Sequence, residues 1–202
     1  MSSQNDLELW HKLKEGDRDA FEVIYHLNFK ALSYYGLRIS KNKNLVQDCI
    51  QDVFTNLWTS RSNLSDVTNV RFYLFRSLKN RLLRNREKDI FDINENIDSY
   101  LDFLTQCSQE DEIIKSESRT QEIQKLRSAI QHLPQRQQEV IHLRFYADLS
   151  LGEIANLMEI NKQSVSNILF RSLALLRPIL KDLVLIFFGY VHINVSFFLM
   201  LV

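Results

Sequence analysis

Glycine and proline are scarce in this chain, with 4 and 2 copies among 202 residues. Sheet-rich domains need a turn signal about every ten residues, and long stretches of this sequence contain neither residue. Leucine, glutamine, lysine, arginine and glutamate, which all favour helices, are frequent instead. The composition therefore argues against a β-sandwich or β-barrel and predicts an all-α fold.

Cysteine is almost as scarce, and catalytic and metal motifs are missing from the sequence. Cys49 and Cys107 form no CxxC pair, and the five histidines (residues 11, 26, 132, 142 and 192) have no zinc-ligand spacing. There is no phosphate-binding glycine loop and no nucleophile elbow. We therefore expect no catalytic residue, metal, cofactor or disulfide. The first residues lack the basic patch and apolar run of a secretory signal, which predicts a cytoplasmic protein.

The formal net charge of zero conceals a strong separation of charge along the chain. Residues 87–122 hold eleven acidic and three basic residues, a net charge of −8, so the rest of the chain carries +8. A uniformly neutral protein would bind DNA poorly, because duplex DNA is held largely by cations that neutralise phosphates. Two basic segments that flank an acidic one keep nucleic acid among the candidate ligands.

Hydrophobic periodicity divides the chain into four parts. Apolar residues recur at helical spacing over residues 7–88, with a polar break at 60–69, and again over residues 120–181. Residues 89–119 are acidic and weakly periodic, which predicts a linker. The sequence thus predicts two small helical domains, an acidic linker and an uncharged tail over residues 183–202.

A helix-turn-helix is predicted in the second domain. Ser150 and Glu153 have the spacing of a capping box, in which each satisfies backbone donors at a helix start. Residues 159–161 follow as a tight turn, and Asn161 can cap a second helix. In that helix the apolar residues share one face, so these residues point outward: Lys162, Gln163, Ser166, Asn167 and Arg171. Such side chains can read base edges and hold phosphates, although a solvated helical hairpin would show the same pattern.

Two segments of the first domain are candidate binding surfaces. A helix over residues 45–58 leaves a polar stripe of Asp48, Gln51, Asp52 and Thr55, which residue types alone would assign to solvated surface. Residues 71–86 hold six basic residues, three aromatic residues and no acidic one. Basic charge beside aromatic rings suits opened, single-stranded DNA, although we expect at least two of the three rings to be core residues.

The sequence resembles the extracytoplasmic-function (ECF) sigma factors of the sigma-70 family in both domains. The residues that resemble region 4 are Leu133-Pro134-Gln135-Arg136-Gln137-Gln138-Glu139-Val140-Ile141-His142-Leu143-Arg144, Leu149-Ser150-Leu151-Gly152-Glu153-Ile154-Ala155 and Ser164-Val165-Ser166-Asn167. Those that resemble region 2 are residues 16–25 and 48–58. The resemblance covers roughly residues 7–181, and it implies promoter recognition as a subunit of RNA polymerase.

Roles for individual residues follow from the resemblance. It implies that Asp48, Gln51 and Asp52 bind core RNA polymerase. It implies that the helix 71–86 and the loop before it recognise the minus-ten promoter element, through Arg71, Arg76, Lys79, Asn80, Arg81 and Arg84. The outward residues Lys162, Gln163, Ser166, Asn167 and Arg171 would read the minus-thirty-five element. An anti-sigma factor is a further implied partner.

Two other functions compete with this interpretation. A conventional helix-turn-helix regulator would bind DNA alone, usually as a symmetric dimer, and would have no affinity for core polymerase. An enzyme acting on nucleic acid would need a carboxylate cluster or metal motif beside the basic helix, and residues 71–86 contain no acid.

The uncharged tail, residues 183–202, lies outside the resemblance. Twenty residues are long enough to cross a bilayer core as a helix, so a membrane anchor is one interpretation. Gly189, His192, Asn194 and Ser196 interrupt the apolar run, however. Packing on the second domain or on a protein partner is therefore the favoured interpretation.

Overall fold

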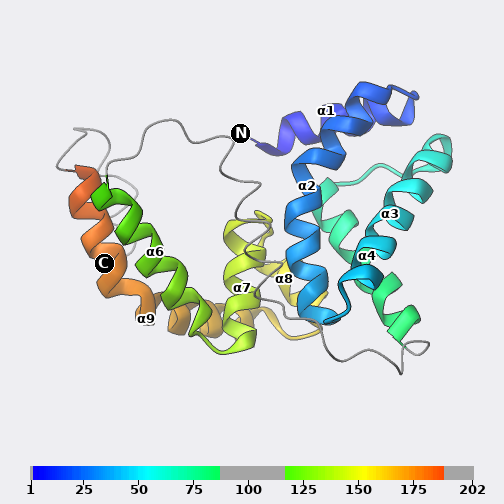
Figure 1. Cartoon of the computed structure of the whole chain (residues 1–202). Coiled ribbons are helices and arrows are strands. Elements are labelled where there is room, and N and C mark those ends of the chain that lie inside the picture. Colours follow the sequence, from blue (N-terminus) through cyan, green and yellow to red (C-terminus); the bar gives the residue numbers. More distant parts are fainter. Residues whose placement is uncertain (1, 87–116, 189–202) are drawn as a thin grey trace.

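The computed structural model of the chain describes residues 2–86 and 117–188. These two stretches are helical apart from short turns, so the predicted all-α fold is confirmed (Figure 1). The first stretch contains α1 (Ser2–Lys14), α2 (Arg18–Ile39), α3 (Lys43–Thr59), the short 3-10 helix η1 (Arg61–Asn63) and α4 (Val70–Arg86). The second contains α6 (Glu117–Gln131), α7 (Gln135–Phe145), α8 (Leu151–Met158) and α9 (Lys162–Phe188). The expected linker lies outside the described residues except for 117–119, which belong to α6.

Side-chain caps and a close contact fix the helices of the first domain. Asp17 caps α2, since its Oδ1 accepts hydrogen bonds from the amides of Asp19 (2.9 Å) and Ala20 (3.1 Å). Asn42 caps α3 in the same way. Gly36 lets α2 and α3 approach each other, because a Cβ at this position would lie 2.6 Å from Cγ1 of Val46. A larger residue here would push the two helices apart.

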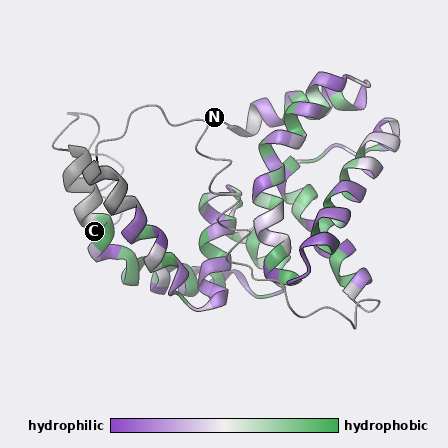
Figure 2. Cartoon of the chain, viewed as in Figure 1, coloured by the Kyte–Doolittle hydropathy of each residue, from purple (hydrophilic) through white to green (hydrophobic). Residues whose placement is uncertain are grey.

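Apolar and polar residues are interspersed along these helices (Figure 2), and the buried apolar side chains form one continuous hydrophobic core. Trp10 and Leu13 of α1 are fully buried in it, so α1 belongs to the domain although the sequence predicted helical periodicity only from residue 7. All three aromatic residues at the start of α4 contact the core. Phe75 is fully buried, and Phe72 and Tyr73 are half-buried against it.

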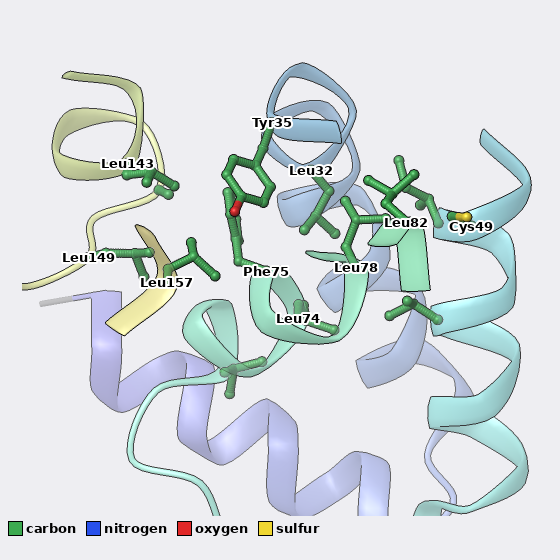
Figure 3. Close-up of a cluster of buried hydrophobic side chains, with 14 of the residues drawn as sticks. Leu32, Tyr35, Cys49, Leu74, Phe75, Leu78, Leu82, Leu143, Leu149 and Leu157 are labelled. Atoms are coloured by element: carbon green, nitrogen blue, oxygen red, sulfur yellow. The ribbon is translucent and has the colours of Figure 1, made fainter. Parts of the chain in front are cut away.

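This core does not stop at the first domain. Leu143, Leu149 and Leu157, from α7, the following turn and α8, are buried in the same cluster as Tyr35 and Phe75 (Figure 3). A second, smaller cluster is formed by Leu133, Ile141 of α7 and Leu176 of α9, and Leu126 and Ile130 of α6 pack against it. The predicted helix-turn-helix is therefore packed directly on the predicted polymerase-binding and minus-ten domain.

The last helix, α9, runs from Lys162 to Phe188 and contains Pro178 in its interior. It therefore includes the first six residues of the predicted tail, while residues 189–202 lie outside the described part of the chain. Within the described ranges 2–86 and 117–188, no helix is long and apolar enough to cross a membrane.

Candidate nucleic-acid interface

The helix-turn-helix is present and is capped as the sequence predicts. The hydroxyl of Ser150 accepts a hydrogen bond from the Glu153 amide (3.3 Å), and the Glu153 carboxylate accepts one from the Ser150 amide (2.8 Å). This reciprocal capping box starts α8. Asn161 then caps α9, because its Oδ1 accepts a hydrogen bond from the Ser164 amide at 2.7 Å. Caps at both helix starts set the angle at which α9 leaves the turn.

The turn between α8 and α9 contains an unusual residue. Glu159 adopts a left-handed backbone conformation, with φ 57° and ψ 41°. Glycine or asparagine is the common choice there, because a Cβ makes this conformation costly. The Glu159 carboxylate lies 2.6 Å from the ammonium group of Lys79 on α4, which also donates to the Leu157 carbonyl at 2.7 Å. This hydrogen bond and the positive charge of Lys79 lower the pKa of Glu159.

The five residues predicted for the minus-thirty-five element come together on the first turns of α9. Lys162, Gln163, Asn167 and Arg171 are exposed, and Ser166 is partly exposed. The Gln163 side-chain amide donates to Oδ1 of Asn167 at 3.1 Å, and the Ser166 hydroxyl donates to the Lys162 carbonyl at 3.2 Å. The opposite face is seated in the core through Val165, which is fully buried. The surface thus presents amides, a hydroxyl and two cations on a rigid helix.

Phe170 lies beside these residues and was missed by the sequence analysis. Its side chain is 76% exposed, although it stands next to Leu169, which is partly buried. Helical spacing puts Phe170 on the face of Ser166 and Asn167. An exposed phenylalanine at a DNA-facing position can contact a thymine methyl group. The sequence signal was an apolar residue on the polar side of the predicted helix.

The residues predicted for the minus-ten element divide into two groups on α4. Arg76, Asn80 and Arg84 are exposed and recur every fourth residue, so they share one face. Arg71, Lys79 and Arg81 instead pair with carboxylates of other segments, namely α1, the turn after α8, and α3. Arg71 lies 3.5 Å from Asp6, Lys79 pairs with Glu159, and Arg81 lies 2.7 Å from Asp52. The side chain of Lys79 is only 17% exposed.

The residues predicted to bind core polymerase lie on α3. Asp48 and Gln51 are exposed, whereas the carboxylate of Asp52 is engaged by Arg81. A predicted polymerase-binding residue and a predicted minus-ten residue therefore contact each other, which the sequence analysis did not foresee. Next to Gln51, a groove of about 610 Å³ between α2 and α3 is lined by the aromatic rings of Phe21, Tyr25, Phe54 and Trp58. This groove adds apolar area to the polar stripe of α3.

Two comparisons with known proteins bear on these surfaces. Residues 129–178 match the family described as Sigma-70, region 4. The structure of CnrH in complex with the cytosolic domain of CnrY matches with a TM-score of 0.51 and 19% identity, over 88% of this chain and 97% of that one. The sigma factor RpoE from Bartonella quintana, solved with the anti-sigma factor NepR, gives a TM-score of 0.48 and 18% identity, over 83% and 98%.

No curated protein sequence matches the chain significantly. The match over residues 129–178 includes all of α7 and α8 and the exposed surface of α9 described above. The likeness to CnrH extends over both helical domains. Residues 129–178 of this chain are therefore similar to sigma-70 region 4, within a chain that has the fold of CnrH.

Proposed function

We propose that this chain is an ECF sigma factor, which binds core RNA polymerase and directs promoter-specific initiation of transcription. The observation that carries the proposal is the region 4 match, whose exposed α9 residues form a surface suited to reading DNA. The helical domain that precedes it, with the acid-free basic helix α4, fits the sigma fold and favours this function over an isolated helix-turn-helix module.

Each surface has a proposed role in promoter recognition. Gln163 and Asn167 read base edges of the minus-thirty-five element in the major groove, while Lys162, Ser166 and Arg171 hold phosphates or guanine. On α4, Arg76, Asn80 and Arg84 contact the opened minus-ten strand. Arg71, Lys79 and Arg81 belong to the same proposed surface once their carboxylate partners release them.

Core polymerase is proposed to bind α3. Asp48 and Gln51 are the exposed part of this surface, and Asp52 joins it when Arg81 moves to DNA. The chain contributes binding energy and sequence recognition, and the phosphodiester chemistry belongs to the polymerase. An anti-sigma factor is the proposed regulatory partner, and the cytoplasm is the proposed compartment. A role for residues 183–202 in membrane association is not favoured.

The proposal is tested by run-off transcription with purified core polymerase on a library of promoter fragments. Specific initiation that depends on the added chain is the expected result. Asp48→Arg should abolish it, because the reversed charge lies on the proposed docking stripe. This single variant is cleaner than one that includes Asp52, whose loss would also disturb Arg81. Glu8→Arg, at an exposed position of α1, is the matched control and should initiate normally.

A stand-alone helix-turn-helix regulator is the competing function. It predicts that the purified chain binds a specific duplex without polymerase and has no affinity for the core enzyme. That pair of results would reject the sigma-factor proposal.

A further inference from the structure

The contact between the two domains buries residues that DNA would need. Lys79 donates to the Glu159 carboxylate and to the Leu157 carbonyl near the end of α8, and its side chain is largely removed from solvent. On the other side of the interface, the Arg38 guanidinium donates to the side-chain oxygen of Gln138, which belongs to α7. The contact is thus built from specific polar bonds around a hydrophobic core.

This arrangement is too compact for simultaneous binding to both promoter elements, if the proposed function holds. The two elements are named for positions about 25 base pairs apart, which is roughly 85 Å along duplex DNA. Lys79 and the turn that precedes α9 are in direct contact here. The residues from Lys162 to Arg171 extend only about 14 Å further along the helix. Because duplex DNA is stiff on this scale, the domains must separate before both elements are engaged.

One ionisable side chain lies in the middle of the contact. His142 of α7 is 7% exposed, and its Nε2 lies 3.1 Å from the Ala31 carbonyl of α2. A carbonyl only accepts, so Nε2 carries the hydrogen and the lone pair of the neutral ring is on Nδ1. The ring stacks on Tyr146 with centroids 5.5 Å apart, and it lies 4.2 Å from the Tyr34 ring of α2. This is a site for a neutral imidazole.

Burial and the positive charge of Arg38 disfavour a proton on His142. Desolvation and, to a smaller extent, the positive charge of Arg38 lower its pKa to about 4, against the opposing effect of the Ala31 carbonyl. Glu139 lies one turn earlier on the same helix, and its own burial raises its pKa. From α4, the ring of Phe75 faces the imidazole at 6.4 Å, and Lys79 adds a further positive charge near Glu139. Separation of the domains would return His142 to water.

We propose that the interface of α2 and α4 with α7 and α8 is an acid-sensitive latch, which withholds Lys79 from nucleic acid and opens when His142 takes up a proton on Nδ1. The signal is the proton itself, and it acts on the free chain before polymerase binds. This inference rests on the proposed function only where it assigns nucleic acid as the ligand of Lys79. The opening itself is a property of the isolated protein.

The size of the expected response follows from linkage. A pKa of about 4 in the closed state and about 6.5 in the open state favours opening about tenfold more at pH 5.5 than at pH 7.5. Protonation of Glu139 works in the opposite direction, because its raised pKa makes the closed state bind that proton more readily. The Glu139→Gln variant removes this opposing effect, so its opening should increase between pH 7.5 and 5.5 by at least as large a factor as in the wild type.

The test is a distance measurement by fluorescence energy transfer in the full chain. Labels are placed at Asn56→Cys on α3 and Ala174→Cys on α9, both exposed, with Cys107→Ser removing a competing thiol. Cys49 stays, since its side chain is fully buried. From pH 7.5 to 5.5 the population with a long distance should rise about tenfold. Binding of a fluorescent single-stranded oligonucleotide should rise with it.

Two variants decide the assignment to His142. His142→Gln keeps a donor for the Ala31 carbonyl and does not titrate, so its long-distance population should not rise at low pH. His26→Gln changes an exposed histidine of α2 and should respond like the wild type. Circular dichroism confirms that helix content is unchanged across the range. A wild type that does not open, or His142→Gln that opens equally, overturns the latch.

The latch and the proposed function can fail separately. Energy transfer reports the latch without polymerase or promoter, and run-off transcription at pH 7.5 reports sigma activity whether or not acid opens the chain. An open wild type at neutral pH would overturn the latch and leave the sigma-factor proposal in place.

Discussion

Helices α4 and α9 are the two predicted DNA-contact elements, and they differ in how many of their predicted contact residues are paired with other segments. On α9 the predicted contact residues make their hydrogen bonds within the helix itself, as far as residues 2–86 and 117–188 are concerned, and the Gln163 to Asn167 pair is an example. On α4 three of the six are paired with carboxylates from α1, α3 and the helix-turn-helix turn. The surface proposed to read duplex DNA is thus already accessible in the free chain. The surface proposed for opened DNA requires partners to be exchanged first.

The largest effect is expected from the shared core beneath α4. Phe75 is fully buried and touches both domains, so Phe75→Ala should lower the free energy of unfolding by about 3–5 kcal/mol. Phe170→Ala on α9 makes the same substitution at a ring that is 76% exposed. It should change the free energy of unfolding by less than about 0.5 kcal/mol. Urea unfolding measures both. Similar losses would show that the exposed face of α9 is packed in solution.

The second-largest effect is expected from acid, which should lower the stability of the folded chain through His142. The folded-state pKa of His142 is lowered to about 4, below its unfolded value, so its neutral form stabilises the fold fully above about pH 6.5. This contribution, up to about 3 kcal/mol, is lost progressively as the pH falls from about 6.5 to 4. Thermal unfolding at several pH values should show the loss in the wild type. If His142→Gln has the same pH dependence, another group is responsible.

Two variants, one on each helix, distinguish contacts to base edges by α9 from contacts to phosphates by α4. Gln163→Ala should weaken the free energy of binding to the preferred minus-thirty-five sequence by about 1–3 kcal/mol and relax selectivity for the contacted base. Arg84→Ala on α4 should weaken binding to all opened sequences alike and reduce the salt slope by about 1. Fluorescence anisotropy of the polymerase complex on promoter variants distinguishes them. Equal loss on all sequences for Gln163→Ala would assign it to phosphate contact.

The smallest effect concerns the cap that aims α9. Asn161→Ala removes the acceptor for the Ser164 amide and should lower stability by about 1 kcal/mol, whereas Asn161→Asp should retain it. Hydrogen exchange of the first turn of α9 measures the change locally. Equal exchange rates in the two variants would mean that packing, and not the Asn161 cap, stabilises the first turn of α9.

Local chemistry explains which predictions the structure confirms. The capping box of Ser150 with Glu153 and the cap at Asn161 involve residues three apart, so the sequence contains both partners of each bond. The apolar face that includes Val165 and Leu176 follows from helical spacing in the same way. The domain boundaries at 7–88, 89–119, 120–181 and 183–202 and the roles of the site residues stay predictions.

The sequence by itself determined the helical class, the helix-turn-helix and the outward face of α9, because each depends on neighbours within one or two turns. Only the tertiary structure decided that Lys79 meets Glu159, that Arg81 meets Asp52, and that His142 lies against Ala31. Surface charges have many possible partners, and these pairs are 80, 29 and 111 residues apart. The packing of whole helices around the common core chooses among them.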